Sequence, residues 1–137
     1  MALLEPATQN SRLAHLTENE RRALAELVER LRRRYGDDLP RVVLFGSKAR
    51  GDFDEESDLD VLVVVTQIPD AAYWRHRREI IEETYDLELE HGIVFSLLVQ
   101  DEPEYARMRQ WNLLINRNIE QDGIVLWTSQ PSEPQFA

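Results

Sequence analysis

The chain has no cysteine, few glycines and no long apolar run among its 137 residues. The absence of cysteine excludes disulfide bonds, thiolate metal ligands and a cysteine nucleophile, so any metal would be held by oxygen atoms or by His15, His76 or His91. No apolar stretch approaches the ~20 residues of a membrane span, and the N-terminus has no pattern of a secretory signal. We therefore expect a cytoplasmic protein with no membrane contact.

Positive charge is also scarce, because 16 Lys and Arg stand against 26 Asp and Glu and give a formal net charge of −10. Non-specific binding to nucleic acids depends mainly on Lys and Arg that release phosphate counterions. A nucleic acid is therefore not the expected partner. The basic residues that do occur gather at 30–34 and 75–78, and we interpret both clusters as solvated helix faces.

The apolar pattern alternates between helices and strands. A capping box at Thr17 and Glu20 starts a helix that Gly36 ends. Further helices are predicted over 70–90, with two adjacent apolar stripes (Trp74, Ile81 and Tyr85; Tyr73, Ile80, Thr84 and Leu87), and over about 104–121. Short apolar runs predict strands at 42–45, 59–65, 93–99 and 124–127.

This order predicts a single α/β (α+β) domain over 1–137, in which a small sheet carries helices. Its core would span about 17–127, with residues 1–16 as an arm or short helical lead-in and 128–137 as a flexible tail. We assign Trp74, Trp111 and Trp127 to the core or to an interface, because they fall on apolar stripes.

The segment from Gly46 to Asp60 connects two predicted strands and carries the clearest chemical signal. Gly46 allows a sharp turn and a close approach of the backbone to an anion, and Ser47 adds a hydroxyl donor. From Lys48 onward a helical turn is expected, whose free N–H groups favour negative charge. Lys48 and Arg50 would add positive charge, so the turn is predicted to hold a triphosphate.

Asp58 and Asp60 open the second strand of this pair. Because side chains alternate along a strand, both would project from one face roughly 7 Å apart, with Leu59 directed into the core. Such carboxylates suit Mg²⁺, and Mn²⁺ can replace it. A glycine–serine turn is a common loop opening, and Asp58 alone could be a turn residue. The combination with two strands predicts a metal and nucleotide site.

Gly46–Gly51 together with Ser57–Val63 resembles the defining motif of the DNA polymerase β-like nucleotidyltransferase superfamily, in its minimal nucleotidyltransferase branch. The resemblance implies a small mixed β-sheet flanked by helices, and transfer of a nucleotidyl group from an NTP, with ATP the expected substrate, to a hydroxyl. It also implies that Gly46 and Ser47 contact the triphosphate and that Asp58 and Asp60 bind two Mg²⁺ ions.

The superfamily usually adds a third carboxylate on a later strand. Here Gly92 to Leu98 matches the expected context, but Ser96 occupies that position. A serine hydroxyl is a poor Mg²⁺ ligand and a poor proton acceptor. Glu88 or Glu90 could replace the missing carboxylate if the chain from Leu87 is a strand, whereas Asp101 lies at the wrong end of the same strand.

Two functions follow. The first is a Mg²⁺-dependent transfer of AMP to a hydroxyl of a protein partner, for which the resemblance suggests a HEPN-type helical protein of a toxin–antitoxin pair. The second is a catalytically weakened NTP-binding antitoxin or partner-binding module, which Ser96 supports. Nucleotidylation of an antibiotic ranks last, because it would require a further helical domain. The acceptor, the base and the existence of a homo-oligomer stay open.

Overall fold

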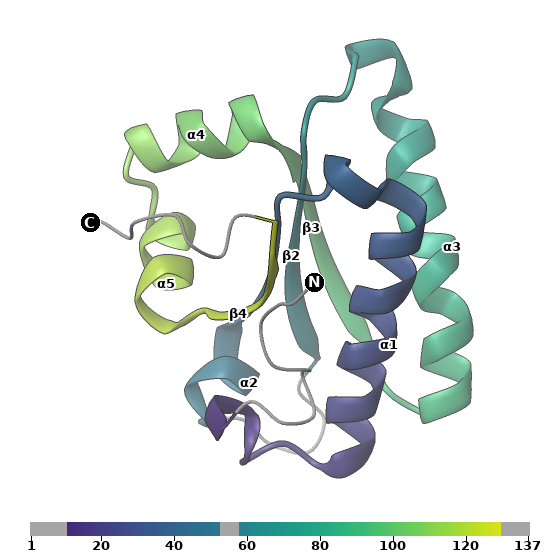
Figure 1. Ribbon diagram of the computed structural model, residues 1–137. Coiled ribbons are helices and arrows are strands. Elements are labelled where there is room, and N and C mark those ends of the chain that lie inside the picture. Colours follow the sequence, from purple (N-terminus) through teal and green to yellow (C-terminus); the bar gives the residue numbers. More distant parts are fainter. Residues whose placement is uncertain (1–10, 53–57, 130–137) are drawn as a thin grey trace.

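A four-stranded sheet lies at the centre of the computed structural model, which describes residues 11–52 and 58–129 (Figure 1). The strands are β1 (Arg41–Phe45), β2 (Leu59–Val65), β3 (Phe95–Asp101) and β4 (Ile124–Thr128), in the order β3-β2-β1-β4. β1 is antiparallel to β2 and β4, whereas β2 and β3 are parallel. The predicted mixed sheet is confirmed.

Helices cover both faces of this sheet. α1 (Glu18–Tyr35) and α3 (Tyr73–His91) lie side by side on one face, and α4 (Glu102–Gln110) and α5 (Leu114–Asp122) lie on the other (Figure 1). α2 (Gly46–Arg50) is a short turn at the end of β1. Short 3-10 turns lie at Ser11–Leu13, Gly36–Asp38 and Asp70–Ala72.

The capping box predicted for α1 is present. The backbone N–H of Glu20 donates to Thr17 Oγ1 and the N–H of Thr17 donates to Glu20 Oε1, each at 3.0 Å. Gly36, with φ of 54°, ends the helix. Leu13 and Leu16 are buried in the core beside α1, so residues 11–16 form the predicted helical lead-in. The remainder of the predicted arm and nearly all of the tail lie outside the described residues.

The alternation of side chains along β2 divides the core into two layers. Leu59, Val61 and Val63 pack toward α1 and α3, whereas Leu62 and Val64 pack against α5 on the opposite face. Each fully buried side chain of this size contributes about 1.5–3 kcal/mol relative to an exposed one. The central strands therefore carry much of the hydrophobic stability.

The predicted helix over 104–121 is wrong as a single element. The chain breaks at 111–113 into α4 and α5, and Asn112 has φ of 55°. Asparagine is one of the few residues that adopt a positive φ readily. Residues 104–121 contain no glycine or proline that would mark this break, so the helical pattern of the sequence continues across it.

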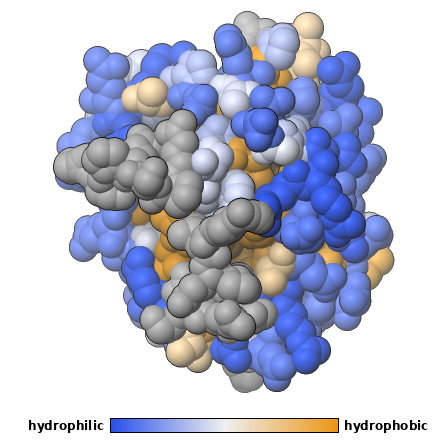
Figure 2. Space-filling view, in the orientation of Figure 1, coloured by the Kyte–Doolittle hydropathy of each residue, from blue (hydrophilic) through white to orange (hydrophobic). Residues whose placement is uncertain are grey.

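The two apolar stripes predicted on α3 have different environments. Ile80, Thr84 and Leu87 are buried against the core, whereas Trp74, Ile81 and Tyr85 are exposed. In the view of Figure 2 the flanks of the molecule are mostly hydrophilic and hydrophobic atoms show mainly along the centre. Within residues 11–52 and 58–129, no helix combines the length and apolar character that a membrane crossing requires.

Candidate functional site

One end of the sheet brings together three segments that are far apart in the sequence. β1 ends where β2 begins, so Phe45 pairs with Asp60, and the parallel neighbour β3 places Ser96 beside Asp60. The backbone N–H of Leu59 donates to the carbonyl of Val94 at 2.9 Å, which fixes this end of β2 against the chain before β3. The Gly46 turn, Asp60 and Ser96 therefore meet at one place.

Gly46 directly follows β1 and lies against the carboxylate of Asp60. Its φ is 77°, and an added Cβ would overlap Asp60 Oδ2 and stand 3.0 Å from Asp60 Cγ. Glycine is therefore required both by the backbone conformation and by the neighbouring side chain. The predicted sharp turn is present, and α2 begins at Gly46 itself rather than at Lys48.

Asp58 and Asp60 differ in their surroundings. Asp58 is exposed at the entrance to β2, Asp60 is half-buried, and Leu59 between them is buried in the opposite core layer, as strand alternation predicts. Burial raises the pKa of Asp60, and the charge of Asp58 raises it further. A hydrogen bond from Ser96 and the charge of Arg50 lower the pKa, but they do not offset the increase. The negative charge of Asp58 therefore disfavours the ionised form of Asp60.

Ser96 occupies the position predicted for the third carboxylate. It pairs with Asp60 in the β2–β3 register, it is exposed, and its hydroxyl hydrogen-bonds to Asp60. Paired residues of neighbouring strands share a face, so Ser96 and Asp60 lie on the side of α4 and α5. A carboxylate at this position would lie directly beside Asp60.

The prediction that Glu90 could replace the missing carboxylate is wrong, because residues 87–90 belong to α3 and not to a strand. Glu90 lies near His91, whose Nε2 is 2.9 Å from Glu26 Oε2 on α1. Glu88 accepts a hydrogen bond from the backbone N–H of Phe95 at 2.9 Å, on the core side of the sheet. Neither glutamate is on the face that carries Asp60.

Lys48, which is predicted to add positive charge to the turn, pairs with a glutamate of α1. Its side chain is buried, and Nζ contacts Glu20 Oε2 at 2.5 Å, while its carbonyl contacts the ring of His15. Burial alone would raise the pKa of Glu20, but the hydrogen bonds from Lys48 and from Thr17 outweigh it and the pKa is lowered. The ammonium group therefore anchors α2 to α1 through the Glu20 carboxylate.

The remaining basic residue of the turn stays near the site. Arg50 is exposed, and its Nε donates to both carboxylate oxygens of Asp52 at 3.1 and 3.2 Å. Its charge also acts on Asp60 and Asp122. The sequence predicted Glu20 only as a capping residue of α1 and gave no role to Asp52 or Asp122. Spacing within a motif could have suggested Asp52, but nothing in the sequence relates Glu20 to Lys48. Residues 53–57 of the motif lie outside the described residues.

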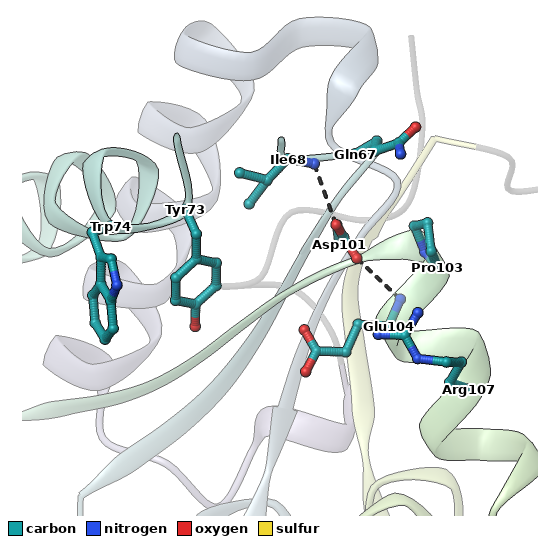
Figure 3. A pocket seen from close by; sticks show the side chains of 8 residues that line it. All are labelled: Gln67, Ile68, Tyr73, Trp74, Asp101, Pro103, Glu104 and Arg107. Carbon is teal, nitrogen blue, oxygen red and sulfur yellow. Dashed lines mark hydrogen bonds between the residues drawn. The ribbon is translucent and has the colours of Figure 1, made fainter. Parts of the chain in front are cut away.

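A separate pocket of about 340 Å³ lies at the other end of the sheet (Figure 3). Tyr73 and Trp74 on α3 face Glu104 and Arg107 on α4 across it, and Asp101 accepts hydrogen bonds from the backbone of Ile68 at 3.3 Å and of Glu104 at 3.0 Å. Asp101 and Ser96 are at opposite ends of β3, about 16 Å apart along the strand. This pocket is therefore distinct from the Asp60 site.

A family model described as a nucleotidyltransferase domain matches residues 24–126, and this range includes β1, α2 and both aspartates. The chain belongs to this nucleotidyltransferase family. The prediction of a nucleotidyltransferase enzyme, made from the motif of Gly46 to Asp60, is confirmed at the level of the family.

Relatives of this nucleotidyltransferase include two proteins of Methanocaldococcus jannaschii that are named as inferred protein adenylyltransferases. One is 34% identical over 109 residues, a match that covers 80% of this chain and 99% of the relative. The other is 43% identical over 63 residues, covering 46% and 61%. An inferred nucleotidyltransferase from Sulfolobus solfataricus has a similar crystal structure, with a TM-score of 0.54 at 24% identity, covering 89% and 92%. This likeness supports the fold alone.

Proposed function

We propose that this nucleotidyltransferase binds ATP with Mg²⁺ at the Gly46 turn, Asp58 and Asp60, and transfers AMP to a hydroxyl of a protein. One observation carries the proposal: Asp60, with Asp58 beside it, packs directly against the glycine turn that ends β1. A phosphate approaching that turn would lie next to both carboxylates. The names of the M. jannaschii relatives support a protein as acceptor.

The donor set fits a divalent cation. Asp58 and Asp60 provide hard oxygen ligands of the kind that Mg²⁺ prefers. Because partial burial, and to a smaller extent the charge of Asp58, raise the pKa of Asp60, a cation between the two carboxylates would relieve an unfavourable interaction that the folded chain otherwise retains. Mn²⁺, which accepts the same ligands, is expected to substitute.

The reaction forms a bond between the acceptor oxygen and the α-phosphorus while the bond to the bridging oxygen breaks and pyrophosphate leaves. Bound Mg²⁺ would neutralise negative charge on the attacking and leaving oxygens. Asp58 and Asp60 would hold the cation, Gly46 leaves room for the Asp60 carboxylate because it has no side chain, and Ser47 and Arg50 offer a hydroxyl and a positive charge. Lys48 pairs with Glu20 and thereby holds α2 in position.

A second function rests on Ser96. The acceptor hydroxyl must lose its proton, and a neutral serine beside Asp60 is a poor base. If Asp60 cannot also accept that proton, the chain binds nucleotide without transferring it, and the nucleotide becomes a ligand of a partner-binding module such as an antitoxin. Binding and transfer are therefore tested separately.

The binding test is calorimetry of the purified chain with Mg²⁺ and a non-hydrolysable ATP analogue. We expect binding in the wild type and in the control Asp37→Asn, an exposed aspartate outside the site, and none in Asp58→Asn/Asp60→Asn. Equal affinity in all three proteins would contradict the assigned site, and no binding to the wild type would contradict both functions.

The transfer test adds the chain and ATP labelled at the α-phosphate to a lysate of the source cells. Label on a protein that requires the wild-type chain and disappears with Asp58→Asn/Asp60→Asn supports the transferase. Binding without label supports the module. Ser96→Asp then places a carboxylate beside Asp60, and we expect it to increase labelling if the missing carboxylate limits the reaction. An unchanged rate would show that proton removal does not depend on this position.

A further inference from the structure

The outer face of α3 carries a row of four large apolar side chains that is separate from its core-facing side, with exposed Arg78 between the first two of them. Trp74, Ile81, Tyr85 and Leu89 are 69, 41, 58 and 68% exposed. They are seven, four and four residues apart, and at 3.6 residues per turn they lie within about 80° of the helix circumference. Exposed apolar rows of this length, about 22 Å from Trp74 to Leu89, usually mark an interaction surface.

The charges beside this row are divided between the two halves of the helix. The first half carries Arg75, Arg77 and Arg78, and the guanidinium of Arg77 lies 5.9 Å from the centre of the Trp74 ring. The second half carries exposed Glu82 and Asp86. Along one helix the sign of the charge therefore reverses near Ile81, at the centre of the apolar row.

If a second α3 helix runs antiparallel to the first, the basic half of each helix lies opposite the acidic half of the other. We propose that α3 is the interface of a two-fold symmetric homodimer, in which a second copy of the chain packs its own α3 antiparallel onto the apolar row. If the axis passes between residues 81 and 82, Trp74 meets Leu89 of the second copy. Arg78 then lies beside Glu82 of the second copy and Arg75 beside its Asp86, and the same contacts recur on the other side of the axis.

A parallel arrangement would instead oppose arginine to arginine and acid to acid, which disfavours it. The apolar row supplies burial, and the divided charges select the orientation. Asp60 and Ser96 lie on the opposite face of the sheet from α3, so both sites of such a dimer stay accessible. The proposal does not depend on the transferase reaction.

The first test is sedimentation equilibrium of the full chain, whose monomer mass is 16.1 kDa. We expect a dimer at micromolar concentration and an increase of about 100-fold in the dissociation constant for Tyr85→Glu/Leu89→Glu. The matched control is Leu114→Glu, which places a charge on another exposed leucine, 64% exposed on α5, and should leave the dimer intact. A wild-type monomer, or a dimer disrupted only by the control, would overturn the proposal.

The second test reverses charges. Arg75→Glu/Arg78→Glu makes the exposed flank of the first half of α3 acidic, and Glu82→Arg/Asp86→Arg makes the exposed flank of its second half basic. Each variant alone should be monomeric, with circular dichroism confirming that it is folded. An equimolar mixture of the two should restore a dimer, because every acidic position then meets a basic one. A mixture that stays monomeric would contradict the antiparallel arrangement, as would two variants that dimerise alone as well as the wild type.

Discussion

At the scale of the residue, Gly46 and Asp60 set the geometry of the site because each limits what the other position can hold. The turn after β1 needs a positive φ, and the carboxylate of Asp60 fills the space where a Cβ would lie. Neither condition alone is unusual. Together they make this the position where the smallest substitution should have the largest effect on the site.

Gly46→Ala should therefore lose Mg²⁺-nucleotide binding and destabilise the fold by about 1–3 kcal/mol, through the strained φ and the displacement of Asp60. Urea unfolding and calorimetry measure the two effects. Gly51→Ala is the control, because Gly51 also has a positive φ, 91°, but an added Cβ would have nothing within 4 Å. It should share the conformational cost and keep binding. Similar losses of binding in both variants would contradict the role of the Asp60 contact.

The raised pKa of Asp60 gives a dependence of stability on pH. The Asp60 carboxyl binds its proton more tightly in the folded state than in the unfolded chain. In the absence of metal, the free energy of unfolding therefore decreases as pH rises from 3.8, the ordinary pKa of aspartate, through the raised pKa of Asp60 in the folded state. Asp60→Asn removes this loss of stability. At pH values above the raised pKa of Asp60, we expect the substitution to stabilise the metal-free protein by about 0.5–1 kcal/mol. Urea unfolding from pH 3.5 to 7 measures the difference from the wild type, and a difference that does not change with pH would contradict the expectation.

At the scale of the element, α2 keeps its place because a buried ion pair joins it to the first turn of α1. The side chains of Lys48 and Glu20 are 3 and 12% exposed, and Glu20 also completes the capping box of α1. One glutamate therefore serves both the start of a helix and the turn that opens the candidate site.

Glu20→Gln should cost about 3 kcal/mol, because it removes the carboxylate that pairs with the buried Lys48 ammonium while glutamine can still complete the capping box. Since the pKa of Glu20 is lowered in the folded state, its contribution is present above 4.5 and is lost as pH falls. Urea unfolding at pH 7 and at pH 3 measures both effects. The control is Glu18→Gln, which removes an exposed pair with Arg22 and should cost less than about 0.5 kcal/mol. Equal costs would show that the buried pair contributes no more than a surface pair.

At the scale of the whole molecule, the candidate site is assembled from segments that the sequence separates widely. The β1–α2 turn, the start of β2 and the start of β3 meet only because β1 and β2 are antiparallel and β2 and β3 are parallel. A ligand that contacts all three segments binds the folded chain and not the unfolded one. Binding is therefore linked to global stability.

Mg²⁺ and the ATP analogue at 100 times the dissociation constant should raise the free energy of unfolding by about 2.7 kcal/mol. Removal of the metal with EDTA should abolish the increase, and Asp58→Asn/Asp60→Asn should not show it. Thermal unfolding followed by circular dichroism provides the measurement. An increase that persists with EDTA would mean that the nucleotide binds without the two aspartates and their metal.

The sequence by itself determined the elements whose signals are local. The capping box of α1, the apolar run of β2 from Val61 to Val65 and the sharp turn at Gly46 each depend on residues within a few positions of one another, and all three are present in the structure. The resemblance to the nucleotidyltransferase superfamily also predicted that Ser96 stands at the position of the third carboxylate, and in the structure Ser96 lies beside Asp60.

Only the tertiary structure decided the features that depend on contacts between distant residues. Lys48 pairs with Glu20, 28 positions earlier, because the fold brings the two side chains within reach of each other. Glu90 was excluded because packing against α1 favours helix where the local pattern also allowed a strand. The two apolar stripes of α3 are equivalent in sequence, and only the position of the sheet decides which is buried. Local backbone preferences are encoded locally, whereas burial and charge pairing depend on which neighbours the fold provides.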